Sequence, residues 1–163
     1  MFEGSTRVPS FWQWKGVFEA GRDISKLTAH FDFVPTFMEL AGIKPVASKP
    51  EHEGRSLLPL FSDPQHKWAD RYLYFNTGKW EPEEDVSDYK FKSAAIRNAK
   101  YRLIWWRDQE ILLNLEKDMT NLDNIAPNHP EIVATMKAEY EKWWRRVYPH
   151  ATKILPPVVE QEW

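Results

Sequence analysis

The pattern of apolar and polar residues predicts an antiparallel sheet in the second half of the chain. Four short runs alternate apolar and polar residues or are apolar throughout, at residues 71–75, 93–98, 101–106 and 110–115. The gaps at residues 98–100 and 107–109 are short enough for hairpins, so these strands are expected to be antiparallel. The longer gap at residues 76–92 is rich in charged and aromatic residues, which predicts an exposed loop.

A long amphipathic helix is predicted after the last of these strands. Pro130 suits the first position of a helix, and Pro149 is expected to stop it. Apolar residues recur between them at spacings of three and four, which places them on one face expected to pack across the sheet: Ile132, Met136, Tyr140, Trp143 and Val147.

The first part of the chain has a different pattern. Residues 8–14 are apolar and aromatic, which predicts a buried or half-buried strand. Asp32 is placed to cap a helix that ends at Gly42, with an apolar stripe made of Phe33, Val34, Phe37, Met38 and Ala41. A proline-rich loop follows between Pro45 and Pro64, and it is the candidate boundary between two structural units.

Composition narrows the functional classes. Apolar residues make up 42% of the 163, which is typical of a globular protein, and the nine Trp, nine Phe and six Tyr form an unusual aromatic load. A net charge of -2 gives no electrostatic sign of nucleic-acid binding, and no apolar run approaches the roughly 20 residues of a membrane span. Because the chain has no Cys, disulfides and thiol chemistry are excluded.

Two clusters of polar residues could carry chemistry, and each also has a simpler interpretation. His30 and Asp32 could be metal ligands or an acid/base pair, but an Asp at a helix start is more often a cap, which we favour. The acidic run at residues 83–85 could bind a cation, but such runs are usually only solvated. We therefore predict no metal site.

Two further residues are candidates for ligand contact. Arg7, beside Gly4, could bind an oxyanion with two hydrogen bonds or could tie its loop to a carboxylate, and both alternatives remain open. Trp80 lies in a charged loop, where it could contact an outside ligand or anchor the loop.

The order of the segments resembles the C-terminal part of the arylsulfatase (sulfatase) family. The resemblance runs from Glu3 to about Tyr148 and rests on EGSTRVP, AHFDFVPTFMELAGI, EGRSLLPLF, AAIRNAKYRLI and ILLNLEKDMTNLDNIA. Each segment is weak alone, but their common order and spacing are specific. Two departures are Ser5, in place of the second Gly of E-G-G-x-R-V-P, and Arg102, in place of the Lys of A-x-R-x-x-x-Y-K-L.

The resemblance implies an α+β fold and a fragment of a longer protein. We expect a four-stranded antiparallel sheet packed on a C-terminal helix at residues 63–163. We expect residues 1–62 to be the last strand and helix of an α/β, alkaline-phosphatase-like catalytic domain. The remainder of that domain would be the missing N-terminal partner, and an apolar surface stripped of it could drive self-association.

The resemblance also implies hydrolysis of sulfate esters by the full-length enzyme, with calcium and a formylglycine made from a C/S-x-P-x-R motif. That motif is absent from these residues, so we expect no catalytic residue and neither cofactor here, and no activity from this part alone. Lys79, Trp80 and Arg7 are the candidates for the rim of the substrate cleft. The family favours a periplasmic or secreted location. The alternative is a stand-alone, aromatic-rich module that binds carbohydrate or another partner.

Overall fold

The computed structural model describes residues 6–44, 53–78, 80–81, 83–118 and 123–151. The chain divides into two compact units, Pro9–Arg71 and Tyr72–Trp163, and Met1–Val8 belongs with the second. We expected the boundary after residue 62, but residues 63–71 are held to the first unit. The Trp68 indole N–H donates to the carbonyl of Leu27 at 3.0 Å, and the Arg55 guanidinium donates to the carbonyl of Ala69 at 2.6 Å.

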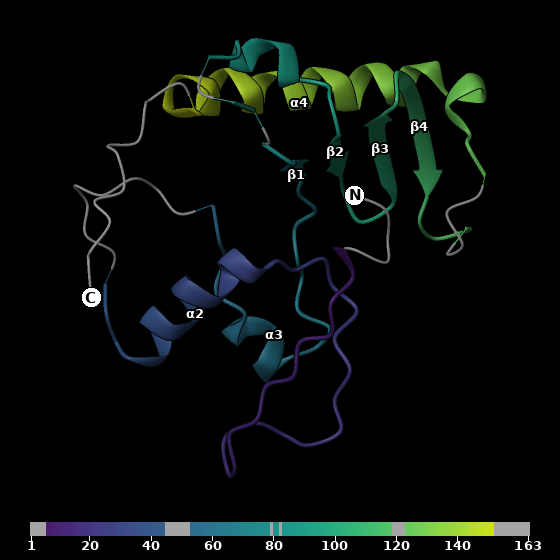
Figure 1. Ribbon diagram of the computed structural model, residues 1–163. Coiled ribbons are helices and arrows are strands. Elements are labelled where there is room, and N and C mark those ends of the chain that lie inside the picture. Colours follow the sequence, from purple (N-terminus) through teal and green to yellow (C-terminus); the bar gives the residue numbers. More distant parts are fainter. Residues whose placement is uncertain (1–5, 45–52, 79, 82, 119–122, 152–163) are drawn as a thin grey trace, which may run out of the picture. The chain divides into compact units, whose positions relative to one another are not determined.

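The second unit contains the predicted antiparallel sheet (Figure 1). Its strands are β1 (Leu73–Asn76), β2 (Ala94–Arg97), β3 (Tyr101–Trp106) and β4 (Gln109–Asn114), and they lie in the order β1-β2-β3-β4. Every neighbouring pair is antiparallel. The β3–β4 turn has both Arg107 and Asp108 in the left-handed region, at φ 49° and 59°, as a two-residue hairpin turn requires.

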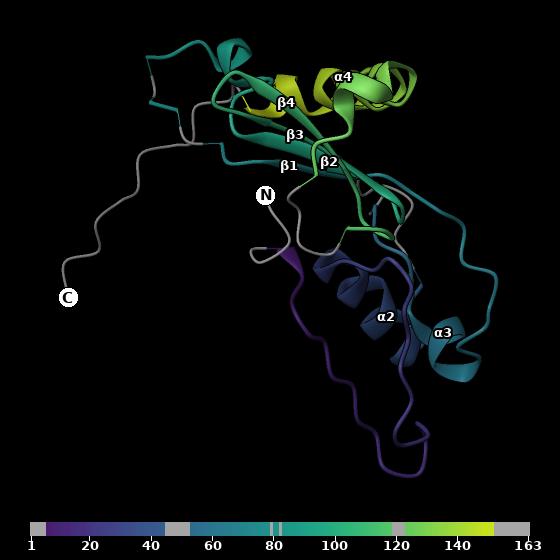
Figure 2. The same ribbon diagram turned by 90° about the vertical axis from the view of Figure 1, so that its right-hand side faces the viewer.

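Helix α4 (Pro130–Ala151) covers one face of this sheet (Figure 2), which confirms the predicted α+β arrangement. The core between them is built from Ile96, Leu103 and Leu112 of the strands and Met136, Tyr140 and Trp144 of the helix. Two details were wrong. Trp144 is more deeply buried than the expected Trp143, and the helix continues past Pro149 to Ala151. A proline in the last turn removes only one backbone donor, so the helix tolerates it there.

The other face of the sheet holds a smaller buried group that includes a charged side chain. Ala95, Ile104 and Leu113 are fully buried there. Arg102, also fully buried, donates from Nη2 to the Thr6 hydroxyl at 2.9 Å. Two of the segments that carry the resemblance, EGSTRVP and AAIRNAKYRLI, are therefore joined by a hydrogen bond.

The first unit is built from short helices: the 3₁₀ turn η1 (His30–Asp32), α2 (Phe33–Leu40) and α3 (Leu58–Ser62). The indole of Trp12 packs among rings of both α-helices, with centroids 5.2 Å from Phe33 and 5.1 Å from Phe61. Helix α3 lies in the proline-rich stretch where we expected only loop. A side chain at Gly54 would put its Cβ 2.2 Å from the Phe31 carbonyl oxygen, so this close approach requires glycine.

The predicted strand at residues 8–14 does not form. These residues have no strand pairing among the described residues, and the Phe11 side chain is 93% exposed. A strand needs a neighbour that satisfies its backbone N–H and C=O groups, and the described residues supply none.

The apolar stripe predicted for α2 was also wrong in part, because Val34 and Phe37 are exposed. The buried face of α2 holds Thr36 instead, whose hydroxyl accepts from the backbone N–H of Leu57 at 2.9 Å and donates to the carbonyl of Asp32 at 2.6 Å. Among the described residues, none of the helices combines the length and the apolar character that a membrane crossing demands.

Candidate functional site

The unit Tyr72–Trp163, with Met1–Val8, is called the sheet unit below, and its loop at residues 76–92 is the candidate functional surface. The side-chain amide of Asn76 joins the two ends of this loop to each other and to α4. Asn76, at the end of β1, donates from Nδ2 to the carbonyl of Tyr89 at 2.9 Å and to the Tyr140 hydroxyl of α4 at 3.2 Å. Its Oδ1 accepts from the backbone N–H of Gly78 at 2.8 Å. Burial raises the pKa of Tyr140 to about 12, so this hydroxyl stays protonated at neutral pH. The loop therefore starts from a fixed base.

Trp80 is half-buried and packs toward the core rather than standing free. Its ring lies 5.9 Å from that of Tyr89. Gly78 has φ +58°, and a Cβ on it would lie 3.3 Å from the Trp80 ring. A larger residue at this position would be strained and would press on the indole. Lys79, the other predicted rim residue of this loop, lies outside the described residues.

The acidic residues of the loop hold its conformation. The Glu84 carboxylate accepts from the Tyr89 hydroxyl at 2.6 Å and from the backbone N–H of Glu81 at 2.7 Å. The Tyr89 hydrogen bond lowers the pKa of Glu84, and the same bond raises the pKa of Tyr89. Asp85 accepts from the backbone N–H of Ser87 at 2.8 Å and so caps the 3₁₀ turn η2 (Val86–Tyr89). We expected these carboxylates to be only solvated, but Glu84 and Asp85 accept hydrogen bonds from groups of their own loop.

Lysines lie over the aromatic rings at the far end of the loop. The Lys92 ammonium is 4.8 Å from the centroid of Tyr89, and the Lys90 ammonium is 4.9 Å from that of Phe91 and 3.1 Å from the Glu141 carboxylate. The loop thus presents aromatic rings, lysines and an excess of carboxylates. Aromatic rings and charged groups of this kind suit contact with the body of a ligand.

Arg7 belongs to the same unit as this loop and is exposed. It follows Thr6, whose hydroxyl is bound by the buried Arg102, so the segment that carries Arg7 is anchored to the sheet. The importance of Arg102 was not visible in the sequence, because a lone Arg in a strand is usually exposed.

Of the candidate pair His30 and Asp32, only Asp32 belongs to a buried ion pair, and its partner is Arg71. Asp32 is fully buried and accepts from Arg71 through both oxygens, with Oδ1 2.8 Å from Nη1. The backbone N–H groups of Ala29 and Arg55 also donate to it, at 2.7 and 2.8 Å. Burial opposes ionisation, but the Arg71 hydrogen bonds and the backbone donors outweigh it and lower the pKa of Asp32.

We predicted that the Asp32 side chain caps α2, and this was wrong. It accepts from Ala29 at the start of the preceding turn η1, while also meeting Arg71 and the loop at Arg55. The sequence analysis missed Arg71, which is 39 positions away from Asp32. His30 contacts the ring of Phe31 and takes no part in the ion pair among the described residues.

The part of the chain that the structure describes does not fit calcium, and the sequence does not fit formylglycine. Within the described ranges, no three His, Asp or Glu side chains gather as metal ligands. The whole sequence contains no Cys and no Ser in a C/S-x-P-x-R motif. No catalytic step is therefore derived from this chain through either group.

Comparison with known proteins gives a consistent result. The family described as "N-sulphoglucosamine sulphohydrolase, C-terminal" matches residues 1–146. Arylsulfatase K of Danio rerio is 31% identical over 169 aligned positions, covering 95% of this chain and 28% of that protein. Choline-sulfatase of Rhizobium meliloti is 30% identical over 140 positions, covering 84% and 25%.

The fold has solved counterparts as well. The crystal structure of Ps i-CgsB superposes with a TM-score of 0.61 and 25% identity, covering 80% of this chain and 27% of that one. The chain thus spans about a quarter of the length of these similar proteins.

Proposed function

This chain belongs to the sulfatase family, in the part described as the C-terminal region, and from this we propose that it is the C-terminal portion of a longer enzyme that hydrolyses sulfate esters. The observation that carries the proposal is the family match over residues 1–146, in a chain that spans about a quarter of its relatives. Calcium and formylglycine would be held by the portion upstream, because the described residues offer no group of metal ligands and the sequence has no C/S-x-P-x-R motif.

In this proposal the unit Pro9–Arg71 completes the α/β catalytic domain. The exposed residues Phe11, Val34 and Phe37 support it, since apolar side chains of this size are normally covered. Residues 8–14, which have the composition of a strand but no partner among the described residues, would pair with a sheet that the upstream portion supplies.

The sheet unit would be structural and would shape the rim of the substrate cleft. The loop at residues 76–92 supports this role, since Asn76 fixes its base and Glu84 and Asp85 hold its conformation. Lys79 and Trp80 of this loop, together with Arg7, are the proposed rim residues. The names of the similar proteins, an arylsulfatase and a choline-sulfatase, differ in substrate, so we propose only the class of sulfate esters.

The test compares this chain with the product of its complete reading frame. We expect the purified 163-residue chain to leave 4-nitrophenyl sulfate intact. We expect the complete protein, with an upstream C/S-x-P-x-R motif, to release 4-nitrophenol. Turnover by the chain alone, with contaminating sulfatases removed, would contradict the proposal. A reading frame that begins at Met1 would also contradict it and would favour the stand-alone module.

A further inference from the structure

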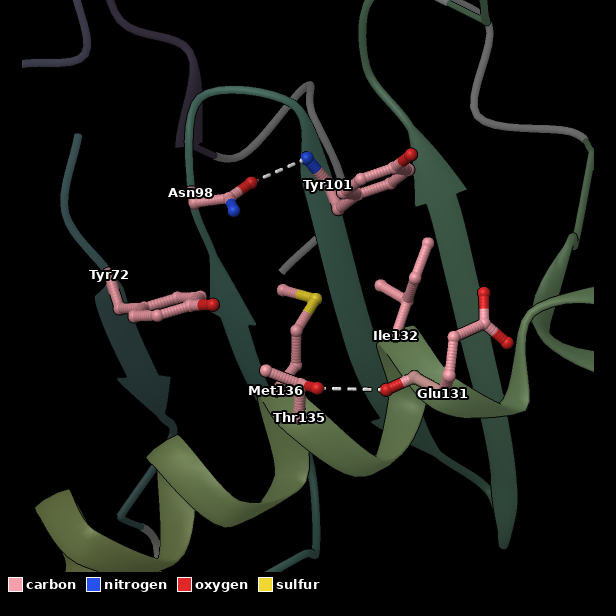
Figure 3. Close-up of a pocket in the computed structure, with 7 residues that line it drawn as sticks. All are labelled: Tyr72, Asn98, Tyr101, Glu131, Ile132, Thr135 and Met136. Atoms are coloured by element: carbon pink, nitrogen blue, oxygen red, sulfur yellow. Dashed lines mark hydrogen bonds between the residues drawn. The ribbon is translucent and has the colours of Figure 1, made fainter.

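A pocket of about 270 Å³ lies in the sheet unit, apart from the rim loop (Figure 3). Its lining comes from three places: Tyr72 just before β1, Asn98 and Tyr101 around the β2–β3 turn, and the first two turns of α4. Ile132 and Met136 of the helix form an apolar floor. Met136 is only 1% exposed, so the surface of this floor that is open to a ligand is that of Ile132. The rings of Tyr72 and Tyr101 stand on either side of this floor in Figure 3.

The polar groups at the pocket are oriented by the fold. Asn98 Oδ1 accepts from the backbone N–H groups of Lys100 at 3.0 Å and Tyr101 at 2.7 Å. These two bonds fix which end of the amide is oxygen, so the Nδ2 group is left to donate elsewhere. Among the described residues, no hydrogen bond uses that Nδ2 group.

Acceptors lie on the helix side of the same pocket. The Thr135 hydroxyl donates to the carbonyl of Glu131 at 2.9 Å, as Figure 3 shows, and its oxygen can still accept. The Glu131 carboxylate is exposed, and His129 Nδ1 lies 3.3 Å from its Oε1. The site therefore combines an amide donor, hydroxyl groups and a carboxylate acceptor around an apolar floor.

We propose that this pocket binds one neutral sugar ring. A pyranose has apolar C–H faces that pack on aromatic and aliphatic side chains, and hydroxyl groups that both donate and accept. The volume is slightly below that of pockets for drug-sized ligands, which suits a single ring. The Glu131 carboxylate would repel a sulfated or phosphorylated ring, so we expect the occupant to be uncharged.

This site goes beyond the proposed sulfatase function and does not rest on it. The proposal assigns binding to this pocket and no chemical step. It would hold an unmodified unit of a glycan, whichever bond the complete protein cleaves.

The test uses saturation-transfer NMR on the 163-residue chain, because that method tolerates self-association. The probes are maltose, cellobiose and lactose, with glucose 6-sulfate as the anionic comparison. We expect saturation transfer to at least one neutral disaccharide, with a dissociation constant in the millimolar range, and weaker transfer to the sulfated sugar.

Variants then assign the binding to this pocket. Asn98→Asp keeps the oxygen that the turn needs but removes the amide donor, and we expect it to weaken binding about fivefold. Tyr101→Phe, which removes one hydroxyl group, should weaken binding two- to fivefold. Glu131→Gln should reduce the discrimination against glucose 6-sulfate.

Glu139→Gln is the control for Glu131→Gln, because it makes the same chemical change at another position of α4. It should alter neither the binding of the neutral disaccharides nor the discrimination against glucose 6-sulfate. Absence of saturation transfer to all three neutral disaccharides would overturn the proposal. Transfer that Asn98→Asp and Tyr101→Phe both leave unchanged would overturn it too, because the sugar would then bind elsewhere. Neither outcome bears on sulfate-ester hydrolysis.

Discussion

At the scale of single residues, Asp32 connects several separate parts of the unit Pro9–Arg71. It joins the turn at Ala29, the backbone at Arg55 and the guanidinium of Arg71, three points far apart in the sequence. Both charged groups are desolvated, with side-chain exposures of 0% and 7%. Removal of one partner leaves the other charge buried without compensation, which is more costly than the loss of an exposed pair.

We expect Asp32→Asn to lower the free energy of unfolding by about 3 kcal/mol at neutral pH, as is typical of a broken buried pair. The folded-state pKa of Asp32 lies below its usual 3.8, so its stabilising effect is complete above that pH and is lost as the pH falls further. The difference between wild type and Asp32→Asn should therefore shrink below about pH 4. Urea unfolding at a series of pH values measures both effects.

The matched control is Asp123→Asn, which changes an exposed carboxylate. It should alter the free energy of unfolding by less than about 0.5 kcal/mol at neutral pH. A stability difference for Asp32→Asn that stays constant from pH 7 to below pH 4 would contradict the role assigned to its ionised form.

Only part of the role of Asp32 could be predicted from the sequence. Asp before an apolar helix predicts a helix start, and the helix is there. A local pattern cannot show that Arg71 reaches Asp32 across 39 positions, because the pair is formed by tertiary packing. For the same reason, Trp80 was recognisable as unusual in a charged loop, but its packing against Tyr89 was not.

At the scale of elements, prediction succeeds where an element finds its partner nearby. The four strands are joined by short hairpins or one loop, so their alternating pattern and their pairing agree. Residues 8–14 have a similar pattern but no strand beside them among the described residues. Helix α3 was missed because prolines obscure a short helix whose second residue, Pro59, is well tolerated in a first turn.

The rim loop is the element on which a functional prediction can be tested. Most of its charges are carboxylates, and Lys79 is the loop lysine proposed for the rim, where a cation would suit an anionic substrate. In the complete protein we expect Lys79→Gln to raise KM for 4-nitrophenyl sulfate two- to fivefold with kcat unchanged. A charge at the rim of a cleft is expected to contribute at most about 1 kcal/mol to binding and not to act on the reacting bond.

Lys117→Gln is the control, since it removes an exposed lysine that follows β4. It should leave both kinetic constants as they are. A fall in kcat for Lys79→Gln at constant KM would assign Lys79 to the reaction itself. Equal effects of the two variants would show that only the overall charge matters.

At the scale of the whole molecule, the exposed apolar side chains are unevenly distributed between the units. Among the described residues, most of the large ones belong to Pro9–Arg71: Phe11, Trp14, Val17, Val34, Phe37 and Ile43. The sheet unit, by contrast, buries a complete core between α4 and its strands. We proposed that the unit Pro9–Arg71 is part of a larger domain and that the sheet unit is not. The uneven distribution of exposed apolar side chains supports this proposal.

If those side chains are normally covered by an upstream portion, the chain alone should cover them by self-association. We expect its weight-average mass in sedimentation velocity to rise with concentration, because burial of apolar surface favours association. The double substitution Phe11→Ser and Val34→Ser should shift the chain toward monomer. Trp106→Ser removes an exposed apolar ring from the sheet unit instead and should leave the association unchanged. A wild-type chain that is monomeric at every concentration would show that this surface needs no partner, and the role proposed for Pro9–Arg71 would lose its support.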